Sequence, residues 1–447
     1  MTPLDYQLPQ TVYYDDSNFP CEYGGGRRQK HARTKGLDIQ PGERIGATTR
    51  QSERGKWAIY TADADGRIFV LGTTVPVGPD SFGWIEEVDP VTLERIRVSP
   101  DLETGGHNFC AGSLLLRDGH FLACFGRYIH KLNLDLEPVG ELELDVDHAH
   151  NGLLLLSDGM AITRNLEHDH QKKSVFTVVD PSSMTQVQQL EFVGASVGRF
   201  CVDPQEDHDH VYATTPTHIH RLIYQDGRLE LDSEWSASYR VPGADQGFAW
   251  CNCVGDDSVW FMDMGDNEIL RQVMTATPVG TEPLDLSGVI YPHSAPVRLH
   301  RVSTDDATSI DSLNLFDVPH AWQGASPLYA PEKRIVMGFD TANGKVGAWK
   351  YHGPGNFSHL WSHDITNSNQ PLYYPDTGEV IVDDVRADQS VDSVVLDIET
   401  GEEKARINTA TMGAAGMAPS PGLGRDYYGC SGVHGALYRI FVETDAV

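Results

Sequence analysis

The chain has 447 residues, 40% of them hydrophobic, with 43 glycines, 25 prolines and a formal net charge of −30. This composition is too apolar for a disordered chain, and the negative charge opposes approach to nucleic acid or to an anionic membrane. No apolar run reaches the ~18 residues of a membrane-spanning helix. We therefore expect neither nucleic acid nor a membrane as a partner.

The first 49 residues precede the repeated part of the chain and form an N-terminal extension. The extension has no apolar signal segment, and the seven cysteines are scattered without metal-site spacing, so we expect reduced thiols and a cytoplasmic location. Residues 27–35 concentrate cationic side chains. They are expected to form a solvated loop, with docking of a protein partner as the alternative.

An apolar run that ends in a tight turn recurs throughout the rest of the chain. It is clearest at residues 113–119, 153–159, 326–331 and 370–375. Repeats of short strands and turns are typical of a β-propeller. The sequence therefore predicts an all-β fold and one propeller domain over residues 1–447.

The turns divide the chain into eight predicted blades of four antiparallel strands, with seven blades as the alternative. The approximate spans are 50–103, 104–146, 147–193, 194–243, 244–319, 320–365, 366–410 and 411–447. The last blade shows only three strands, and an open edge would aggregate, so an N-terminal strand should close the ring. Leu8–Tyr14 is the candidate. An extra stretch at about 266–294 in blade five predicts a lid or a binding loop.

Two short motifs resemble those of the quinoprotein-like (PQQ-type repeat) β-propellers. One is the Asp-x-x-Thr-Gly hairpin at Asp397–Gly401, and the other is the strand pattern of Tyr128–Leu132, which recurs at 218–222 and 436–440. The resemblance implies a ring of seven or eight four-stranded blades. In the dehydrogenases of that group, the hairpin motif continues to a docking tryptophan. The hairpin at Asp397–Gly401 has no such tryptophan after it, and in the similar segment Asp340–Trp349 the tryptophan comes one residue too late. We therefore expect no PQQ.

Histidines gather where loops enter the inner strands of a propeller. His148 and His150 lie two residues apart at the start of blade three, so they should face the same way on a strand. Two imidazoles in this arrangement form half of a site for a divalent metal such as zinc, manganese or iron. His107 and His320, which open blades two and six, are the candidates to complete it. The alternative is that these histidines only hydrogen-bond neighbouring blades.

Further polar residues are expected at the same mouth of the channel. His168, His170 and His218 could transfer protons, because a neutral imidazole titrates near pH 7. Arg164 ends a second strand and could hold a carboxylate by a two-point fork. Solvated histidines and a surface ion pair are the alternatives.

These expectations favour a metal-dependent lyase or hydrolase that acts on a small organic or carbohydrate-like substrate at the channel mouth. The alternatives are an oxygenase or other oxidoreductase with the same metal, a metal-free lyase that uses histidine, tyrosine and arginine, and a non-catalytic propeller that binds a protein.

Overall fold

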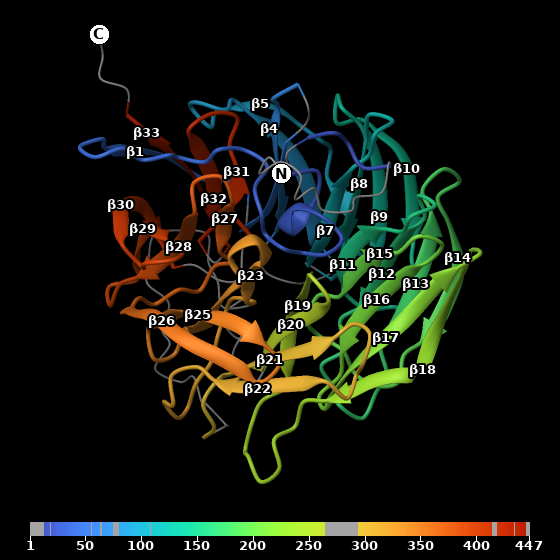
Figure 1. Cartoon of the computed structure of the whole chain (residues 1–447). Helices are drawn as coiled ribbons and strands as arrows, with labels where there is room; N and C mark the ends of the chain where they lie inside the picture. Colours follow the sequence, from blue (N-terminus) through green and yellow to red (C-terminus); the bar gives the residue numbers. More distant parts are fainter. Residues whose placement is uncertain are drawn as a thin grey trace.

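Eight antiparallel sheets surround a central channel in the computed structural model (Figure 1). The structure describes residues 13–17, 19–54, 56–62, 65–74, 80–107, 109–263, 294–413, 418–432 and 434–443. Helical structure in these residues is limited to two short 3-10 turns, η2 (Glu22–Gly24) and η3 (Pro331–Lys333). The predicted all-β propeller of eight blades is confirmed.

The blades follow the chain order, and each sheet pairs consecutive strands, except that β6 pairs with β4 and β1 pairs with β33. Blade one contains β2 (Lys56–Ala62), β3 (Ile68–Thr73), β4 (Phe82–Val88) and β5 (Arg95–Val98), with β6 (Leu102–Glu103) paired to β4. Blade two contains β7 (Cys110–Leu115), β8 (His120–Phe125), β9 (Tyr128–Asn133) and β10 (Pro138–Glu143). Blade three contains β11 (His150–Leu155), β12 (Ala161–Asn165), β13 (Val175–Asp180) and β14 (Thr185–Glu191), and blade four contains β15 (Cys201–Pro204), β16 (Asp209–Thr214), β17 (His218–Gln225) and β18 (Arg228–Ser238).

Blades five to eight repeat the pattern. Blade five contains β19 (Ala249–Gly255), β20 (Ser258–Asp263), β21 (Arg298–Ser303) and β22 (Ile310–Asn314), and blade six contains β23 (Leu328–Ala330), β24 (Ile335–Asp340), β25 (Lys345–Gly353) and β26 (Asn356–Asp364). Blade seven contains β27 (Leu372–Tyr374), β28 (Glu379–Val385), β29 (Ser390–Asp397) and β30 (Glu403–Met412). Blade eight contains β31 (Ser420–Pro421), β32 (Asp426–Ser431) and β33 (Ala436–Val442), and β1 (Ile45–Gln51) is its fourth strand.

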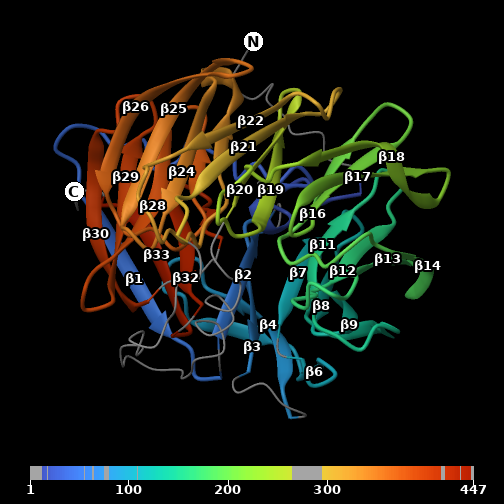
Figure 2. The ribbon, with the colours of Figure 1, turned by 90° about the horizontal axis from the view of Figure 1, so that it is seen from below.

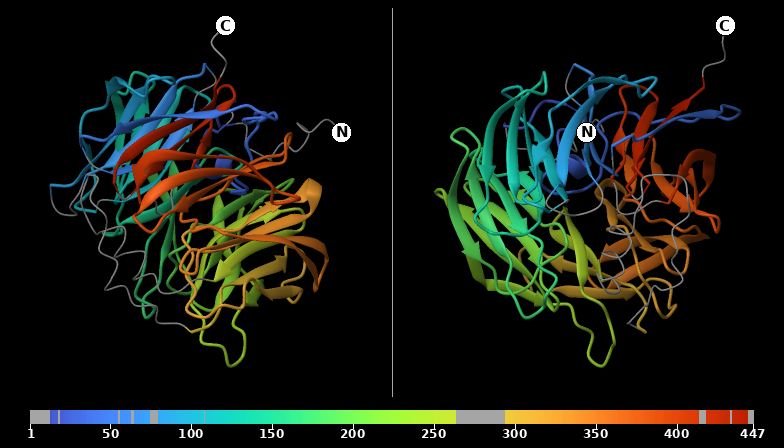
Figure 3. Two further views of the ribbon diagram at one scale, coloured as in Figure 1. Left: turned by 90° about the vertical axis from the view of Figure 1, so that its left-hand side faces the viewer. Right: turned by 180° about the vertical axis from the view of Figure 1, so that it is seen from behind.

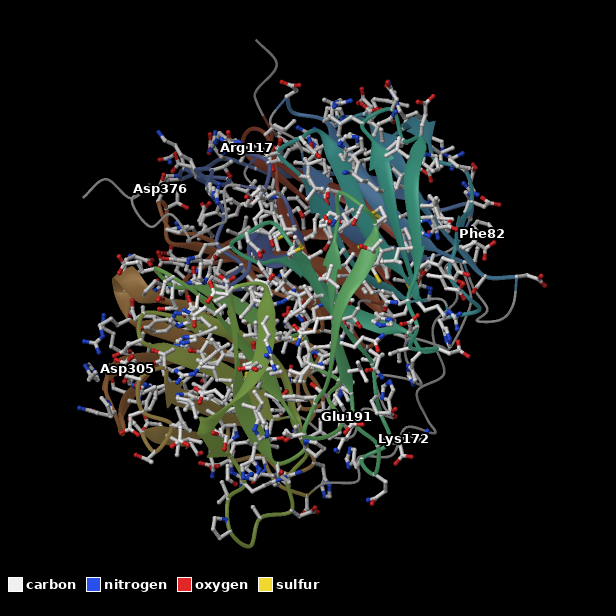
Figure 4. All side chains as sticks on the ribbon, turned by 90° about the vertical axis from the view of Figure 1, so that its right-hand side faces the viewer. Phe82, Arg117, Lys172, Glu191, Asp305 and Asp376 are labelled. Carbon is white, nitrogen blue, oxygen red and sulfur yellow. The ribbon has the colours of Figure 1, made fainter. Side chains whose placement is uncertain are left out.

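The channel has two distinct ends. We call the end where the inner strands begin the upper end and the end where they finish the lower end. Because the strands are antiparallel, the loops between second and third strands share the upper end, and the turns after first and third strands share the lower end. Figure 4 shows this separation: Phe82, Lys172 and Glu191 of the upper end lie opposite three residues of the lower end, Arg117, Asp305 and Asp376.

The ring is closed by an N-terminal strand, as expected, but the segment differs from the one predicted. β1 pairs antiparallel with β33, from Ile45 opposite Val442 to Gln51 opposite Ala436, and the two strands lie side by side in Figure 2. Tyr14 instead forms an isolated bridge to Leu116 of blade two, and residues 8–12 lie outside the described part. β1 directly precedes blade one, so it reaches the free edge of blade eight without a long connection.

Residues 13–44, which we call the strap, run across the lower end of the channel before β1 begins. Their backbone bonds to inner strands of several blades; the Gly26 carbonyl accepts from the Val202 amide at 2.9 Å, and Ala32 and Tyr373 share a bond of 2.8 Å. Figure 1 and both views of Figure 3 place η2 and the adjoining strap in the middle of the ring. The strap therefore occupies the space that an open channel would leave at this end.

The basic segment 27–35 belongs to the strap, and its central part is buried. Arg28 and Lys30 are each 1% exposed, and His31 is 5% exposed. The expectation of a solvated loop is therefore wrong for these three residues. The reason is that the channel interior supplies carbonyl groups, such as that of Pro327 for the Lys30 ammonium at 2.8 Å, which satisfy the cations away from water.

Two tryptophans connect neighbouring blades at the lower end. Trp361 of β26 donates its indole N–H to the Ile398 carbonyl of blade seven at 2.9 Å, and its ring covers Gly401. Trp235 of β18 donates in the same way to Ser303 of blade five at 3.1 Å. The Asp397–Gly401 hairpin therefore has a docking tryptophan, which comes from the preceding blade.

The predicted insertion in blade five connects β20 to β21, at the upper end. Of the stretch 266–294, only Ser294 is described, and the prediction of a lid or binding loop lies outside the described residues. Among the helices that the structure describes, none is long and apolar enough to cross a membrane.

Candidate functional site

His107 and His148 lie next to each other at the upper end. Their rings are stacked almost parallel, with centroids 6.1 Å apart and an interplanar angle of 5°. The His107 Nε2 atom lies 3.1 Å from Asp147 Oδ1, which also accepts from Arg127 at 2.8 Å. Hydrogen bonds from His107 and Arg127 lower the pKa of Asp147. The ring nitrogen of His107 is therefore bound to a carboxylate.

His150 is fully buried and stays neutral. Its Nδ1 lies 3.1 Å from the His148 carbonyl, so Nδ1 carries the proton and Nε2 keeps its lone pair. Burial lowers the pKa of His150 to about 3, opposed by backbone hydrogen bonds from His148 and Gly126 and assisted by the charges of His148 and Arg164. The Nε2 atom has no hydrogen-bond partner.

The four predicted metal ligands do not converge. All four histidines are described, yet no group of three His, Cys, Asp or Glu side chains in the described chain could hold a metal ion. β11 begins only at His150, so His148 lies in the preceding loop and the alternation of strand side chains does not apply to it. His320 lies exposed in a loop, with a backbone φ of 55°.

The loops of blades three to six and the start of β19 bring apolar side chains together at the upper end, and we call this group the mouth cluster. Its members are Leu166, Val197, Phe248, Trp250, Cys251 and Trp322. The predicted proton-transfer residue His170 is exposed and packs edge-on against Phe248, with ring centroids 5.4 Å apart. His168 lies in the same loop and is half-buried. His218 begins β17, where its ring lies 5.7 Å from that of His220.

Arg164 is buried rather than displayed at the mouth. Its guanidinium donates to the carbonyls of Asn165, Val197 and Gly198 and to the Ser196 hydroxyl. The alternative of a surface ion pair is therefore wrong for Arg164, and its role in holding a carboxylate stays a prediction. Burial lowers the pKa of Arg164 to about 9, and the positive charges of Arg199 and Arg28 add to the effect.

Sequence reasoning missed the charged group that the strap carries into the channel. Glu22 Oε2 accepts from Arg28 at 3.1 Å and from Arg199 at 2.5 Å, and all three side chains are almost fully buried. Arg164 lies close enough for the charges of both arginines to act on it. Two buried guanidinium groups thus share the carboxylate of Glu22, and the third, that of Arg164, is bonded to carbonyls and a hydroxyl. We call Glu22, Arg28, Arg164 and Arg199 the channel arginine group.

Several buried polar atoms near this group have no hydrogen-bond partner in the described structure. They are Tyr23 OH, Arg28 Nη2, His150 Nε2, Asn151 Oδ1 and both amide atoms of Gln323. A Cβ on Gly152 would lie 3.3 Å from Arg28 Nη2, which places that atom beside β11. Buried polar groups are normally bonded, so this concentration is unusual and marks the upper part of the channel as the candidate site.

No family model and no curated protein matches the sequence. Solved structures do match. The quinohaemoprotein alcohol dehydrogenase of Comamonas testosteroni has a TM-score of 0.61 and 11% identity, covering 95% of this chain and 80% of that one. The chain therefore shares the β-propeller fold of this dehydrogenase. A europium-containing methanol dehydrogenase (TM-score 0.59, 8% identity, 94% and 97% coverage) and BamB from Moraxella catarrhalis (0.52, 11%, 90% and 98%) are also similar.

Proposed function

We propose that this protein is an enzyme that acts on a small organic anion at the upper mouth of the channel. The observation that supports this most strongly is the channel arginine group, because Arg28 and Arg199 share the single carboxylate of Glu22 and the buried Arg164 contacts no carboxylate among the described residues. Guanidinium groups bind carboxylates in pairs of hydrogen bonds, and their field is stronger in a low-dielectric interior. This local positive charge occurs in a protein whose net charge is −30.

The side chains around the mouth favour acid–base chemistry. His170 is exposed and held against Phe248, so it can exchange protons with solvent and substrate. His150 is too weak a base at a pKa of about 3 and is assigned as a hydrogen-bond acceptor. Burial raises the pKa of Tyr23, so its hydroxyl keeps its proton and can donate a hydrogen bond. We therefore prefer a metal-free lyase, with arginines that bind the anion and His170 that removes a proton.

The experiment is a thermal-unfolding screen with small organic acids and their neutral alcohol or amide analogues. An anion that binds should raise the melting temperature of the wild type, and Arg164→Gln should abolish the shift. Arg301→Gln is the matched control, because Arg301 is equally buried but lies in blade five beside Asp311, at 3.4 Å. A screen in which neutral analogues stabilise as well as acids would contradict the proposal. Anions that bind are then tested for elimination by the ultraviolet absorbance of a new double bond.

A metal-dependent reaction is the version that the sequence favoured, and it stays a proposal. His107 and His148 would supply two ligands, and their adjacent rings support this choice. Elemental analysis of the desalted protein tests it. Stoichiometric metal that is lost in His148→Ala would favour a divalent metal ion, and a metal-free protein with full activity would reject it.

An oxidoreductase is the second candidate for the reaction. Two of the similar solved structures are named as dehydrogenases, and the mouth cluster contains two buried indole rings, those of Trp250 and Trp322, a type of side chain on which planar cofactors stack. A dye-reduction assay with alcohols, before and after addition of quinone cofactors, tests this candidate. Dye reduction that requires Trp322 would support it.

We also propose a cytoplasmic location. All seven cysteines are buried and unpaired, which suits a reducing compartment. Fractionation of cells that express the protein, with antibody detection, would test this.

A further inference from the structure

Two imidazoles at the lower end direct their nitrogens at each other. His208 lies in the turn between β15 and β16, and His210 lies in β16. Their Nε2 atoms are 2.9 Å apart, with ring centroids separated by 4.6 Å and planes inclined by 62°. Other close histidine pairs of the described chain differ: the rings of His107 and His148 are stacked with centroids 6.1 Å apart.

The surrounding structure holds both rings in this orientation. The turn is closed by a hydrogen bond of 2.8 Å from the Gln205 amide to the His208 carbonyl. His208 Nδ1 lies 2.6 Å from Asp207 Oδ1, and His210 Nδ1 lies 3.3 Å from the Tyr212 hydroxyl. Each ring is therefore fixed on its Nδ1 side. Carboxylates and hydroxyls in this position orient the imidazoles that bind metals.

The pair is accessible and carries lone pairs. The His208 side chain is 26% exposed. Because Nδ1 of His208 donates to Asp207, its Nε2 atom is a bare acceptor. His210 has two states: it either donates Nε2–H to His208 while it accepts from Tyr212, or it donates Nδ1–H to Tyr212 and presents a second lone pair. In the second state, the Nε2 lone pairs of both rings are available to bind one metal ion.

We infer that His208 and His210 form a two-nitrogen site for a divalent transition metal, with copper or nickel preferred over zinc. Metal–nitrogen bonds of about 2.0–2.1 Å at a right angle place two nitrogens about 2.9 Å apart, whereas a tetrahedral angle places them about 3.3 to 3.4 Å apart. The observed 2.9 Å fits the right angle. Right angles between nitrogen ligands are typical of Cu²⁺ and Ni²⁺. Water completes the coordination.

The local charge supports a cation at this point. Asp207 contacts His208 directly, and Asp203 and Asp209 lie within electrostatic range of His208. Asp203 is neutralised by Arg27 at 2.5 Å. On the opposing side, Arg221 lies near His210 but is paired with Asp232 at 2.6 Å. The unpaired carboxylate charge thus exceeds the unpaired guanidinium charge around the two rings.

The site is separate from the proposed enzyme site. It lies in blade four at the lower end, whereas the channel arginine group and the mouth cluster face the upper part of the channel. Metal binding here requires neither the proposed substrate nor any activity, so either proposal can fail alone.

The test is a titration of the chelator-treated protein with Cu²⁺ at pH 7, followed by electron paramagnetic resonance and calorimetry. The wild type should bind one more equivalent of Cu²⁺ than His208→Asn or His210→Asn, with a two-nitrogen hyperfine pattern for that ion. His120→Asn is the matched control, because it removes a partly exposed imidazole that also lies against a carboxylate, that of Asp118 at 3.0 Å. Equal stoichiometry and spectra in the wild type and both variants would overturn the inference.

A second measurement uses the unmodified sequence and does not depend on variants that fold. Diethyl pyrocarbonate should modify His208 in the metal-free protein, and Cu²⁺ or Ni²⁺ should suppress this modification in peptide mass spectra, while Mg²⁺ should not. Modification that is equally fast with and without Cu²⁺ would contradict the site. Stronger protection by Zn²⁺ than by Ni²⁺ would overturn the right-angle preference.

Discussion

The two ends of the channel are built differently. At the lower end, the strap bonds to the inner strands of blades two, four, five and seven, and tryptophans connect blade four to five and blade six to seven. At the upper end, the mouth cluster is formed by loops and the start of β19, and several buried polar atoms, such as His150 Nε2 and Asn151 Oδ1, lack partners in the described structure. A fixed lower end provides the support against which loops at the other end can bind a ligand precisely.

The largest expected effect comes from the carboxylate of Glu22, through which the strap pairs with Arg199 of the ring. Glu22→Gln leaves Arg28 and Arg199 buried without a carboxylate, and breaking a buried ion pair costs about 3–5 kcal/mol. Urea unfolding should show a clear loss of stability. Glu43→Gln is the control, because Glu43 pairs with Arg425 near the surface and its loss should have little effect. Equal effects of the two variants would mean that the strap contributes no special stability.

Gly26 tests how closely the strap approaches the ring. A Cβ at this position would lie 2.7 Å from the Val202 carbonyl oxygen, a backbone atom that cannot rotate away. Gly26→Ala should destabilise the protein by about 1–3 kcal/mol, as overpacking does. At Gly194 the nearest atom, of Thr215, lies at an ordinary 3.4 Å, so Gly194→Ala should be much milder. A neutral Gly26→Ala variant would show that the strap is loosely held.

Two tryptophans of similar burial, one at each end, allow a direct comparison of how strongly the two ends are stabilised. Trp361 is 7% exposed and bonds to Ile398, whereas Trp322 is 6% exposed and its indole nitrogen has no hydrogen-bond partner. Trp361→Phe should therefore cost about 1 kcal/mol more than Trp322→Phe, the typical net contribution of one hydrogen bond. Thermal unfolding of both variants measures the difference. A larger loss at Trp322 would reverse the assignment of the lower end as the more tightly connected one.

A pH-dependent comparison comes from two buried histidines, one at each end. Burial lowers the pKa of His150 to about 3 and that of His31 to about 4, from 6.5. Between these values and 6.5 the unfolded chain binds more protons, so stability should fall as the pH decreases from 6.5. His150→Gln and His31→Gln should each lose less stability than the wild type between pH 6.5 and 4.5. Parallel pH profiles of all three proteins would exclude buried neutral imidazoles at both ends.

The sequence predicted the ring well because its evidence is local. The repeated run-and-turn pattern at 113–119 and 153–159 depends on neighbouring residues, and it correctly indicates eight blades and a closing N-terminal strand. The identity of that strand was wrong, because Ile45–Gln51 and Leu8–Tyr14 both read as short strands. Only the position of the free edge of β33 decides between them.

The site was harder to predict because it depends on contacts between distant segments. Arg28 appears in the sequence as part of a charged surface loop, and only the passage of the strap through the ring brings it to Glu22 and Arg199. His208 and His210 appear as residues of an inner turn, and the spacing of their nitrogens depends on Asp207 and Tyr212.

The sequence by itself determined the architecture, since strand periodicity and turn residues are properties of short segments. Only the tertiary structure decided which charges and imidazoles meet. Pairing energies between groups far apart in the chain depend on distance and burial, and neither quantity can be read from residue order.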